Sequence, residues 1–188
     1  GRAGRAARRL VVGAPPQARH VAHRGRAGPG VAPAQTDRQR FAVVQGRDGV
    51  LYGTTFNGGA FGAGTLFRAR IAGQVTVLRS FDPSGEGGHP TARLTQGHDD
   101  ALYGTTMWGG AGGAGTAFRA STGGALSILH VFEVNTTGRY PSGALLEIDD
   151  GAFYGTAVRG GPYGPGTIFR VNGGGGAQLL HAFAPGVG

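Results

Sequence analysis

Residues 41–188 carry short apolar segments separated by glycine-rich turns, which is the pattern of β-strands. Between residues 92 and 132 there are four such segments, five to seven residues long: Ala92–Gln96, Ala101–Thr106, Thr116–Ala120 and Leu126–Phe132. They alternate apolar with polar positions or are rich in aromatic and β-branched residues, which suit a pleated, half-buried surface. No apolar period of 3.6 residues lasts long enough for a helix. The pattern therefore predicts an all-β fold.

The same group of segments recurs at a fixed period of 51 residues. A five-residue motif, LYGTT or FYGTA, occurs three times in register: Leu51–Thr55, Leu102–Thr106 and Phe153–Ala157. A second motif, GTxFR, keeps the same offset at Gly64, Gly115 and Gly166. Between residues 51–101 and 102–152, 23 of 51 positions are identical without an insertion, which indicates a tandem repeat rather than chance similarity.

Four antiparallel strands in about 50 residues is the spacing of a β-propeller blade. The strand-bearing cores of the three units are expected at residues 41–81, 92–132 and 143–183, with the first strand of the first unit inside Phe41–Val50. Propellers typically close with four to eight blades. We therefore expect a partial, β-propeller-like arrangement and a chain that is a fragment of a longer protein. A β-trefoil-like closure of the three units is the alternative.

Composition excludes several other classes of protein. Glycine accounts for 40 of the 188 residues, and each interior helical glycine costs about 1 kcal/mol relative to alanine, so a helical protein is disfavoured. The chain has no cysteine, which rules out a disulfide framework and a thiolate metal site. No apolar run approaches the roughly 18 residues of a membrane span, so none is expected.

The net charge of +8 comes entirely from residues 1–40, which hold nine arginines and one aspartate. This segment has four prolines and no aromatic residue, so it cannot bury enough apolar surface to offset its chain entropy and is predicted to be disordered. An arginine-rich arm can bind phosphate backbones, although we do not expect nucleic acid as the main partner. Its Arg/Ala/Gly/Pro bias without lysine also fits sequence that is not native coding sequence.

The repeated motifs resemble the bacterial GloVer tandem repeat, whose pattern is P-x-x-x-L, L-Y-G-T-T-x-x-G-G, G-T-x-F and L-H-x-F in that order. The third copy shows its parts most fully: Pro141, Leu145, Tyr154-Gly155-Thr156, Gly160-Gly161, Gly166–Phe169 and Leu180–Phe183. The resemblance covers residues 41–188, with Arg79 standing where His130 and His181 stand in the other copies. It implies a propeller-like fold in a secreted or cell-surface protein, and it defines no catalytic or binding residue.

The repeated side chains are expected to be structural, because each unit must reproduce the same packing against its neighbour. Tyr52, Tyr103 and Tyr154 can form a ring of hydroxyl groups for a ligand, but we expect their rings to fill the seams between units. The glycine-rich loops lack the lysine and the following helix of a phosphate-binding loop, so turn formation is the better interpretation.

The acidic pairs Asp99-Asp100 and Asp149-Asp150 can in principle bind a metal ion or act as acid and base, but adjacent aspartates in a turn more often cap their own backbone. The histidines show no zinc-ligand spacing, and His130 and His181 are expected to be satisfied within a sheet. We therefore expect no catalytic residue, no metal and no cofactor.

Residues that differ between units are the better candidates for specificity. The same two positions after the Tyr-Gly-Thr strand hold three unlike pairs: Phe56-Asn57, Met107-Trp108 and Val158-Arg159. These positions are expected at a loop mouth, where Trp108, the single tryptophan, can stack on a sugar ring. Asn57, Trp108 and Arg159 are the candidate ligand-binding residues.

Taken together, the sequence favours a non-enzymatic structural or ligand-binding β-repeat module of a secreted or cell-surface bacterial protein. Its expected partners are a glycan, a surface protein, or further repeats of its own full-length chain. An enzyme that acts on polysaccharide at a propeller mouth is the first alternative, and nucleic-acid binding through residues 1–40 is the second.

Overall fold

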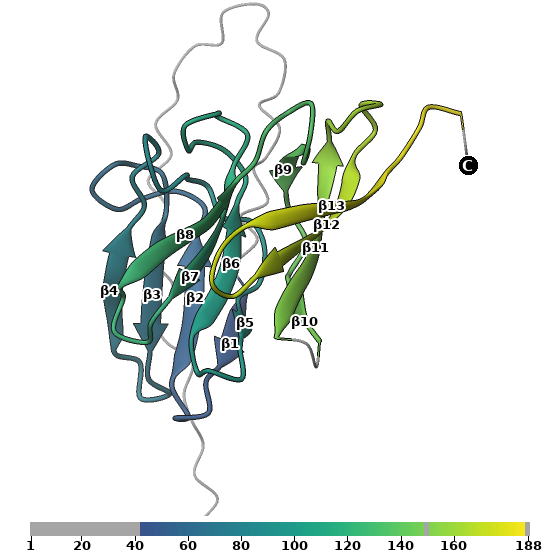
Figure 1. The fold of residues 1–188 in the computed structure, drawn as a ribbon. Helices are drawn as coiled ribbons and strands as arrows, with labels where there is room; N and C mark the ends of the chain where they lie inside the picture. Colours follow the sequence, from purple (N-terminus) through teal and green to yellow (C-terminus); the bar gives the residue numbers. More distant parts are fainter. Residues whose placement is uncertain (1–41, 149–150, 187–188) are drawn as a thin grey trace, which may run out of the picture. The chain divides into compact units, whose positions relative to one another are not determined.

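The computed structural model describes residues 42–148 and 151–186 (Figure 1). Within these ranges it contains strands and no helix, which confirms the all-β prediction. The predicted disorder of residues 1–40 and the acidic pair Asp149-Asp150 lie outside the described residues.

The strands form three antiparallel sheets in chain order. The first contains β1 (Val43–Gln45), β2 (Leu51–Thr55), β3 (Thr65–Ala69) and β4 (Val75–Ser80). The second contains β5 (Thr95–Gln96), β6 (Leu102–Thr106), β7 (Thr116–Ala120) and β8 (Leu126–Val131). The third contains β10 (Leu146–Glu147), β11 (Ala152–Arg159), β12 (Thr167–Asn172) and β13 (Ala177–Ala182), and β9 (Arg139–Pro141) also pairs with β11.

The predicted three-fold repeat of four strands is present in these sheets, and none of them closes into a barrel. No strand of one sheet pairs with a strand of another among the described residues, so the β-trefoil-like alternative finds no support here. A register shift also falls at the same place in every sheet, between Leu66 and Phe67, Ala117 and Phe118, and Ile168 and Phe169.

The glycine of the Tyr-Gly-Thr motif makes room for a phenylalanine ring. Gly104 in β6 pairs with Phe118 in β7, and Gly53 and Gly155 pair in the same way within their own sheets. A Cβ atom added to Gly104 would lie 2.6 Å from Cζ of Phe118, which is completely buried. Glycine is therefore needed in this strand because the aromatic ring occupies the space of its side chain.

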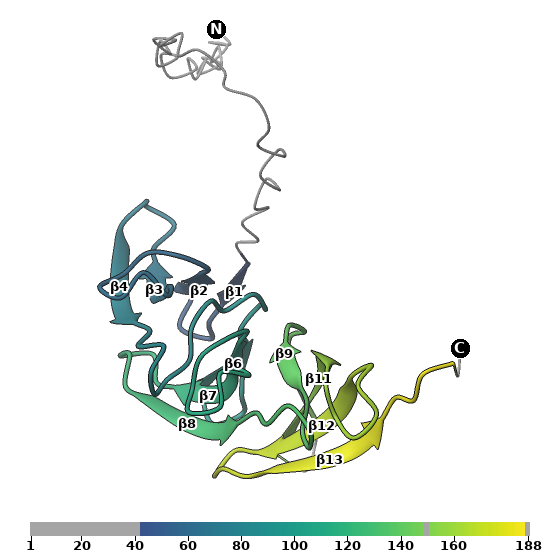
Figure 2. The same ribbon diagram turned by 90° about the horizontal axis from the view of Figure 1, so that it is seen from above.

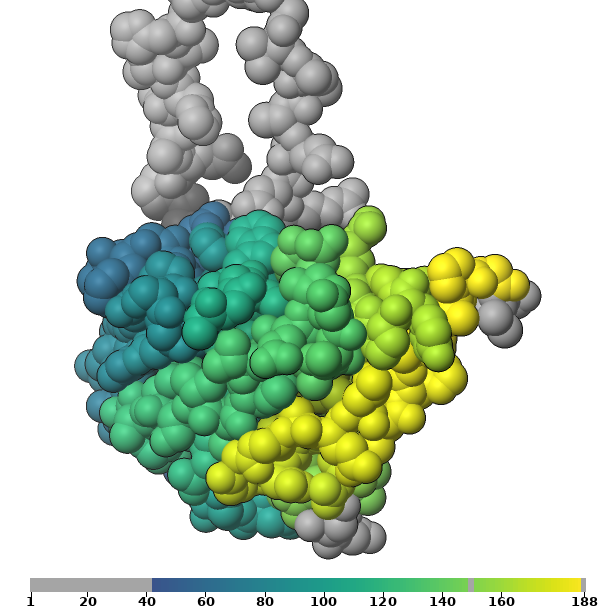
Figure 3. Space-filling view, turned by 45° about the horizontal axis from the view of Figure 1, so that its top comes forward, coloured from purple at the N-terminus to yellow at the C-terminus, as the bar shows by residue number. Residues whose placement is uncertain are grey.

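Neighbouring sheets are joined by aromatic packing that repeats at the same period. Phe81, after β4, packs on Phe118 of the second sheet with ring centroids 5.2 Å apart, and Phe132 packs on Phe169 of the third sheet at 4.7 Å. Figure 3 shows the second and third sheets in direct contact as green and yellow surfaces. The hydrophobic core therefore lies between sheets, because each sheet buries one face against the next.

The segments that connect the sheets run along the loops of the following sheet. The backbone N–H of Gly110 donates to the carbonyl of Pro83 at 3.0 Å, and that of Gly161 donates to Val134 at 2.7 Å, one period later. The bridge between Gly88 and Trp108 is likewise the earlier counterpart of the β9–β11 pairing. Both connectors therefore pair with the loop end of the following sheet, and in the third sheet this pairing is long enough to form the strand β9.

The first strands of the second and third sheets are shorter than predicted, whereas β1 lies inside the predicted range Phe41–Val50. Ala92–Gln96 was expected to be extended throughout, but only Thr95 and Gln96 pair with β6. The chain bends before them, because His89 has a left-handed φ of 56° and the next residue, Pro90, has no N–H to donate to a sheet. The outer strands β4, β8 and β13 match the prediction closely, and Figure 2 shows them on the side away from β1 and β9.

We predict that Gly104→Ala destabilises the fold by about 1–3 kcal/mol, because the added methyl group must displace a buried ring. Urea unfolding followed by circular dichroism measures the loss as a lower midpoint. Gly85→Ala is the matched control: Gly85 is exposed, and nothing lies within 4 Å of the position of its added Cβ. Equal midpoints for the two variants would contradict the role assigned to the glycine–phenylalanine pair.

Candidate functional site

The three candidate residues from the sequence occupy equivalent positions, but no described contact joins their side chains to one another. Trp108 exchanges two backbone hydrogen bonds with Gly88, of 2.7 and 3.1 Å. The carbonyl of Asn57 accepts a hydrogen bond from the hydroxyl of Thr55 at 2.8 Å. Arg159 lies at the end of β11, opposite Arg139. Each of them therefore marks the loop end of its own sheet.

Trp108 instead belongs to an aromatic cluster with Phe56 and His89. The indole ring centroid is 5.7 Å from that of Phe56 and 4.9 Å from that of His89, and both contacts are edge-to-face. Phe56 and His89 lie 4.8 Å apart, and 39% of Trp108 is exposed. The cluster brings together the loop of the first sheet, the connector and the loop of the second sheet. It thus forms a partly exposed aromatic surface at one end of the first interface.

His89 is held in this cluster by its backbone. Its N–H donates to the carbonyl of Ala63 at 2.7 Å, and its carbonyl accepts from Met107 at 3.2 Å. Its Nδ1 lies 3.1 Å from the carbonyl oxygen of Phe56. A non-glycine residue with positive φ carries strain of about 1–2 kcal/mol, so these bonds keep the imidazole against the two other rings.

The second interface has a different surface at the corresponding place. Tyr140 replaces His89 and has the same left-handed backbone, with φ of 61°. The guanidinium carbon of Arg139 lies 4.9 Å from the centroid of the Tyr140 ring. Met107 and Arg159 stand where the first interface has Phe56 and Trp108. The framework is therefore the same at both interfaces, while the exposed side chains change from aromatic to cationic.

Sequence reasoning missed His89 as a site residue, and it named Phe56 only as the neighbour of Asn57. The signal was present for both. Position 89 differs from its repeat counterpart Tyr140 just before an otherwise repeated proline, and position 56 is one of the two variable positions already identified. What the sequence did not show is that the connector carries position 89 up to the loops.

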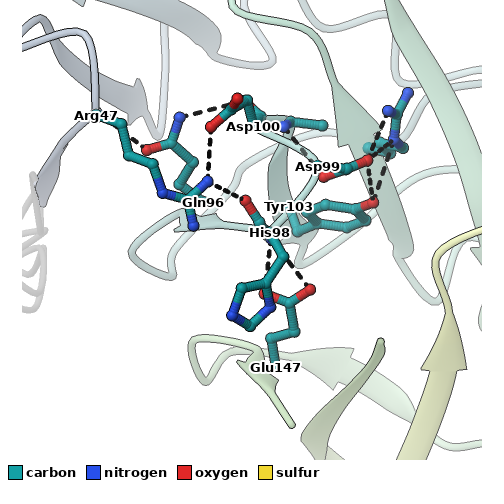
Figure 4. Close-up of polar contacts among 10 residues, drawn as sticks. Arg47, Gln96, His98, Asp99, Asp100, Tyr103 and Glu147 are labelled. Atoms are coloured by element: carbon teal, nitrogen blue, oxygen red, sulfur yellow. Dashed lines mark hydrogen bonds and ion pairs between the residues drawn. The ribbon is translucent and has the colours of Figure 1, made fainter. Parts of the chain in front are cut away.

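At the opposite end, polar side chains join the hairpin turns of neighbouring sheets (Figure 4). The backbone N–H of Arg47 donates to Oε1 of Gln96 at 2.9 Å, and its guanidinium binds Asp100 at 2.6 Å. One period later, the N–H of His98 donates to the carboxylate of Glu147 at 3.0 Å, and Nδ1 of His98 lies 3.0 Å from the same oxygen. These contacts fix one sheet against the next.

The carboxylate of Asp99 is engaged in structural contacts at its own turn. Its Oδ1 accepts the N–H of Ala101 at 3.1 Å, while its Oδ2 accepts the hydroxyl of Tyr103 at 3.0 Å and the guanidinium of Arg119 at 2.6 Å. Asp48 makes the equivalent bonds to Val50 and Tyr52. The prediction that Asp99 caps its own backbone is confirmed, and its partner Asp100 binds Arg47.

The tyrosine rings lie in the seams between sheets, as predicted for Tyr52 and Tyr103. Both are 2% exposed, and the Tyr103 ring stacks on Phe153 of the third sheet with centroids 3.7 Å apart. Burial, and then the hydrogen bond to Asp48, raises the pKa of Tyr52 to about 12. These hydroxyl groups therefore serve the packing and do not form a ligand ring.

The other titrating groups are also fixed by packing contacts. Burial raises the pKa of Asp99, but the hydrogen bonds from Arg119, Ala101 and Tyr103 outweigh it and leave the pKa below its ordinary value. Burial lowers the pKa of His130, against a smaller opposing effect of Glu133. Asp99 therefore stays ionised and His130 stays neutral around pH 7. Among residues 42–148 and 151–186, no group of three or more acidic or histidine side chains could hold a metal ion.

A small cavity of about 250 Å³ lies where the first strands of the sheets approach one another. Its lining contains one charged side chain, Arg93, and its full set is Val44, Arg93, Leu94, Thr95, Gln96 and Ala144. This lining supplies a guanidinium rather than the pair of carboxylates that glycoside hydrolysis uses.

In the described part of the chain, no helix is long and apolar enough to cross a membrane.

Three sheets with the same internal registers and the same sheet-to-sheet contacts define an all-β tandem-repeat protein. The chain belongs to the Gloeobacter/Verrucomicrobia repeat family, whose sequence model matches residues 32–188. The match confirms the resemblance seen in the motifs and begins nine residues earlier than the motifs indicated.

One solved structure to which the chain is similar is the crystal structure of a protein of unknown function from Dyadobacter fermentans. The two sequences are 15% identical and the TM-score is 0.45. The similarity covers 75% of this chain and 53% of the other, so this chain spans about half the length of that structure. No curated protein matches the sequence.

We predict that Tyr52 ionises near pH 12, later than an ordinary tyrosine at pH 10, in an absorbance titration that uses Tyr52→Phe to identify its signal. Because the folded pKa is the higher one, the stability from neutral Tyr52 is complete below pH 10 and is lost as the pH rises toward 12. Asp48→Asn should lower this pKa, since it removes the carboxylate that accepts the hydroxyl proton.

The matched control for this titration is Asp82→Asn. Asp82 also caps a turn, accepting the N–H of Ser84 at 2.9 Å, but it has no tyrosine partner. It should leave the titration of Tyr52 unchanged. Loss of the late-titrating signal in both variants would show that global opening, not the Asp48–Tyr52 bond, controls the ionisation.

Proposed function

We propose that the chain is a non-enzymatic, propeller-like repeat module of a secreted or cell-surface bacterial protein, and that it binds a glycan at the aromatic cluster of Phe56, His89 and Trp108. The observation that carries this proposal is the contrast between the two interfaces. Their frameworks coincide, yet the first presents three aromatic rings and the second presents arginines beside a tyrosine. Variation of exposed side chains on a constant scaffold is typical of a binding surface.

The chemistry of the cluster suits a sugar ring. Trp108, a residue that is 39% exposed, offers an indole for the C–H groups of a pyranose, while the edge-to-face contacts with Phe56 and His89 hold the ring in place. A rigid aromatic surface of this kind loses little conformational entropy when a ligand binds.

Several observations favour binding over catalysis. Asp48 and Asp99 are engaged in capping turns and in holding tyrosines, and His130 bonds to the hydroxyl of Thr137 at 3.0 Å. The cavity between the first strands presents a guanidinium to a substrate. The polysaccharide-cleaving enzyme therefore remains the weaker candidate, and the nucleic-acid alternative depends on residues 1–40, outside the described part.

The propeller-like arrangement is supported by the way in which the sheets repeat. Each contains four antiparallel strands in chain order and packs face to face on the next through the same positions. This places all long loops, and hence the aromatic cluster, at one end of the sheets and all tight hairpin turns at the other. Propellers bind ligands on such loop ends, although this analogy concerns the fold alone.

Binding can be read directly from Trp108 because it is the single tryptophan. We predict that a glycan selected on an array shifts and changes the intensity of its fluorescence in a saturable manner. Phe56→Ala should weaken the affinity about tenfold, since one aromatic contact is worth about 1–1.5 kcal/mol. Trp108→Ala should abolish detectable capture on the array.

Tyr163→Ala is the matched control, since Tyr163 is an exposed aromatic residue, 61% accessible, on the loop of the third sheet. Its affinity should equal that of the original chain. Glycan capture that survives Trp108→Ala would contradict the proposed site. Release of reducing sugar from the captured polysaccharide by the full chain, and its loss in a variant of Arg93, would instead favour the enzyme.

A further inference from the structure

Each sheet has two faces, and the chain uses them in the same way at both of its interfaces. The trailing face, which contacts the following sheet, is observed in the first two sheets at four repeated positions: Tyr52/Tyr103, Leu66/Ala117, Leu78/Leu129 and Phe81/Phe132. The same positions in the third sheet are Tyr154, Ile168, Leu180 and Phe183. The leading face, which contacts the preceding sheet, is observed in the last two sheets at three positions: Leu102/Phe153, Phe118/Phe169 and Leu126/Ala177. The same positions in the first sheet are Leu51, Phe67 and Val75. The interface is therefore a pairing of a trailing face with a leading face, and it occurs twice.

The trailing face of the third sheet is exposed. Phe183 is 43% exposed, whereas its counterparts Phe81 and Phe132 are completely buried. Leu180 is 45% exposed, whereas Leu129 is 8% exposed in the second sheet. Phe183 and Leu180 therefore expose, on the third sheet, two apolar positions whose counterparts are buried in the second sheet.

The leading face of the first sheet is exposed as well. Val75 and Val77 in β4 are 65% and 57% exposed, while the equivalent residues of β8, Leu126 and Ile128, pack on the core between the first two sheets. Phe67 is only partly buried, in contrast to Phe118.

Two glycines of the first sheet also lack the backbone neighbours that their counterparts in the second sheet have. A Cβ on Gly109 would lie 2.5 Å from the carbonyl oxygen of Pro83, and one on Gly124 would lie 2.7 Å from that of Leu78, both in the preceding repeat. Their first-sheet counterparts, Gly58 and Gly73, have no atom within 4 Å of the same position. The contacts that a preceding sheet would make are thus the ones that the first sheet lacks.

We propose that the trailing face of the third sheet binds the leading face of the first sheet of a second copy of this chain. The two surfaces are the trailing and leading halves of an interface that the chain already forms twice, and the trailing Ile168 would meet the leading Leu51 much as Leu66 meets Leu102 in the first interface. Phe183 then lies on Phe67 of the second copy, as Phe81 lies on Phe118 at 5.2 Å. This inference does not depend on glycan binding.

The geometry also sets the number of copies. A trailing-to-leading contact is heterologous, so it produces either a closed ring or an open filament. Two copies bring together six sheets, which falls within the four to eight at which propellers close. We infer a head-to-tail dimer in which both exposed apolar faces of each copy are buried.

Light scattering coupled to size-exclusion chromatography on the full 188-residue chain tests this directly. A dimer has twice the chain mass of 19.0 kDa. Phe183→Asp and Val77→Asp alter opposite faces, and each should give the monomer. Phe61→Asp is the control: Phe61 is 57% exposed, and its counterpart Gly112 stays exposed between two neighbouring sheets, so this variant should remain dimeric.

Mixing the two face variants distinguishes this arrangement from others. Phe183→Asp still has an intact leading face and Val77→Asp an intact trailing face, so the mixture should recover pairs joined by one unaltered interface, while each variant alone stays monomeric. Circular dichroism should show unchanged strand content, because both residues are exposed. An original chain that is monomeric at every concentration would assign the faces to further repeats of a longer chain and overturn the proposal. Open polymers, or insensitivity to Val77→Asp, would overturn it as well.

Discussion

The aromatic contact between consecutive sheets is the interaction on which the rest of this structure depends. The ring of Phe118 packs on Gly104 within its own sheet and on the ring of Phe81 from the preceding sheet. One side chain therefore contributes both to the packing inside a sheet and to the packing between sheets. Phe132 and Phe169 repeat this contact one period later. A single repeat cannot bury its hydrophobic face alone, so each sheet depends on its neighbour for stability. The strict period, the path of the connectors and the position of the loops all preserve this contact.

Most of the scaffold could be predicted from the sequence, because a repeat makes each strand visible three times. The second, third and fourth strands lie within a residue of their predicted bounds except β11, which continues past Ala157 to Arg159, and Asp99 caps its turn as expected. The first strands of the second and third sheets were predicted too long. Their apolar residues, such as Leu94, are buried without pairing in the sheet, and apolar pattern alone does not distinguish these two states.

The candidate site was predictable only in part. Variation between copies singled out Trp108, which lies in the aromatic cluster, but Asn57 and Arg159 belong to other loop ends and share no described contact with it. The true neighbours, Phe56 and His89, come from one loop and one connector of the preceding repeat. Alignment of the repeats compares the same position in each copy, whereas a surface between two sheets is formed by different positions of neighbouring copies. The residues of such a surface can be identified only when the packing of one sheet against the next is known.

The same positions form both interfaces, but the side chains at these positions differ in size. These differences favour one order of the sheets. The first interface combines Leu66 with Leu102, and the second combines Ala117 with Phe153, so a smaller residue on one face accompanies a larger one on the other. Exchanging partners would leave a void beside Ala117 or crowd Leu66 against a phenylalanine ring, and both errors cost stability. Modules of the same fold thereby discriminate against stacking in the wrong order while the chain folds.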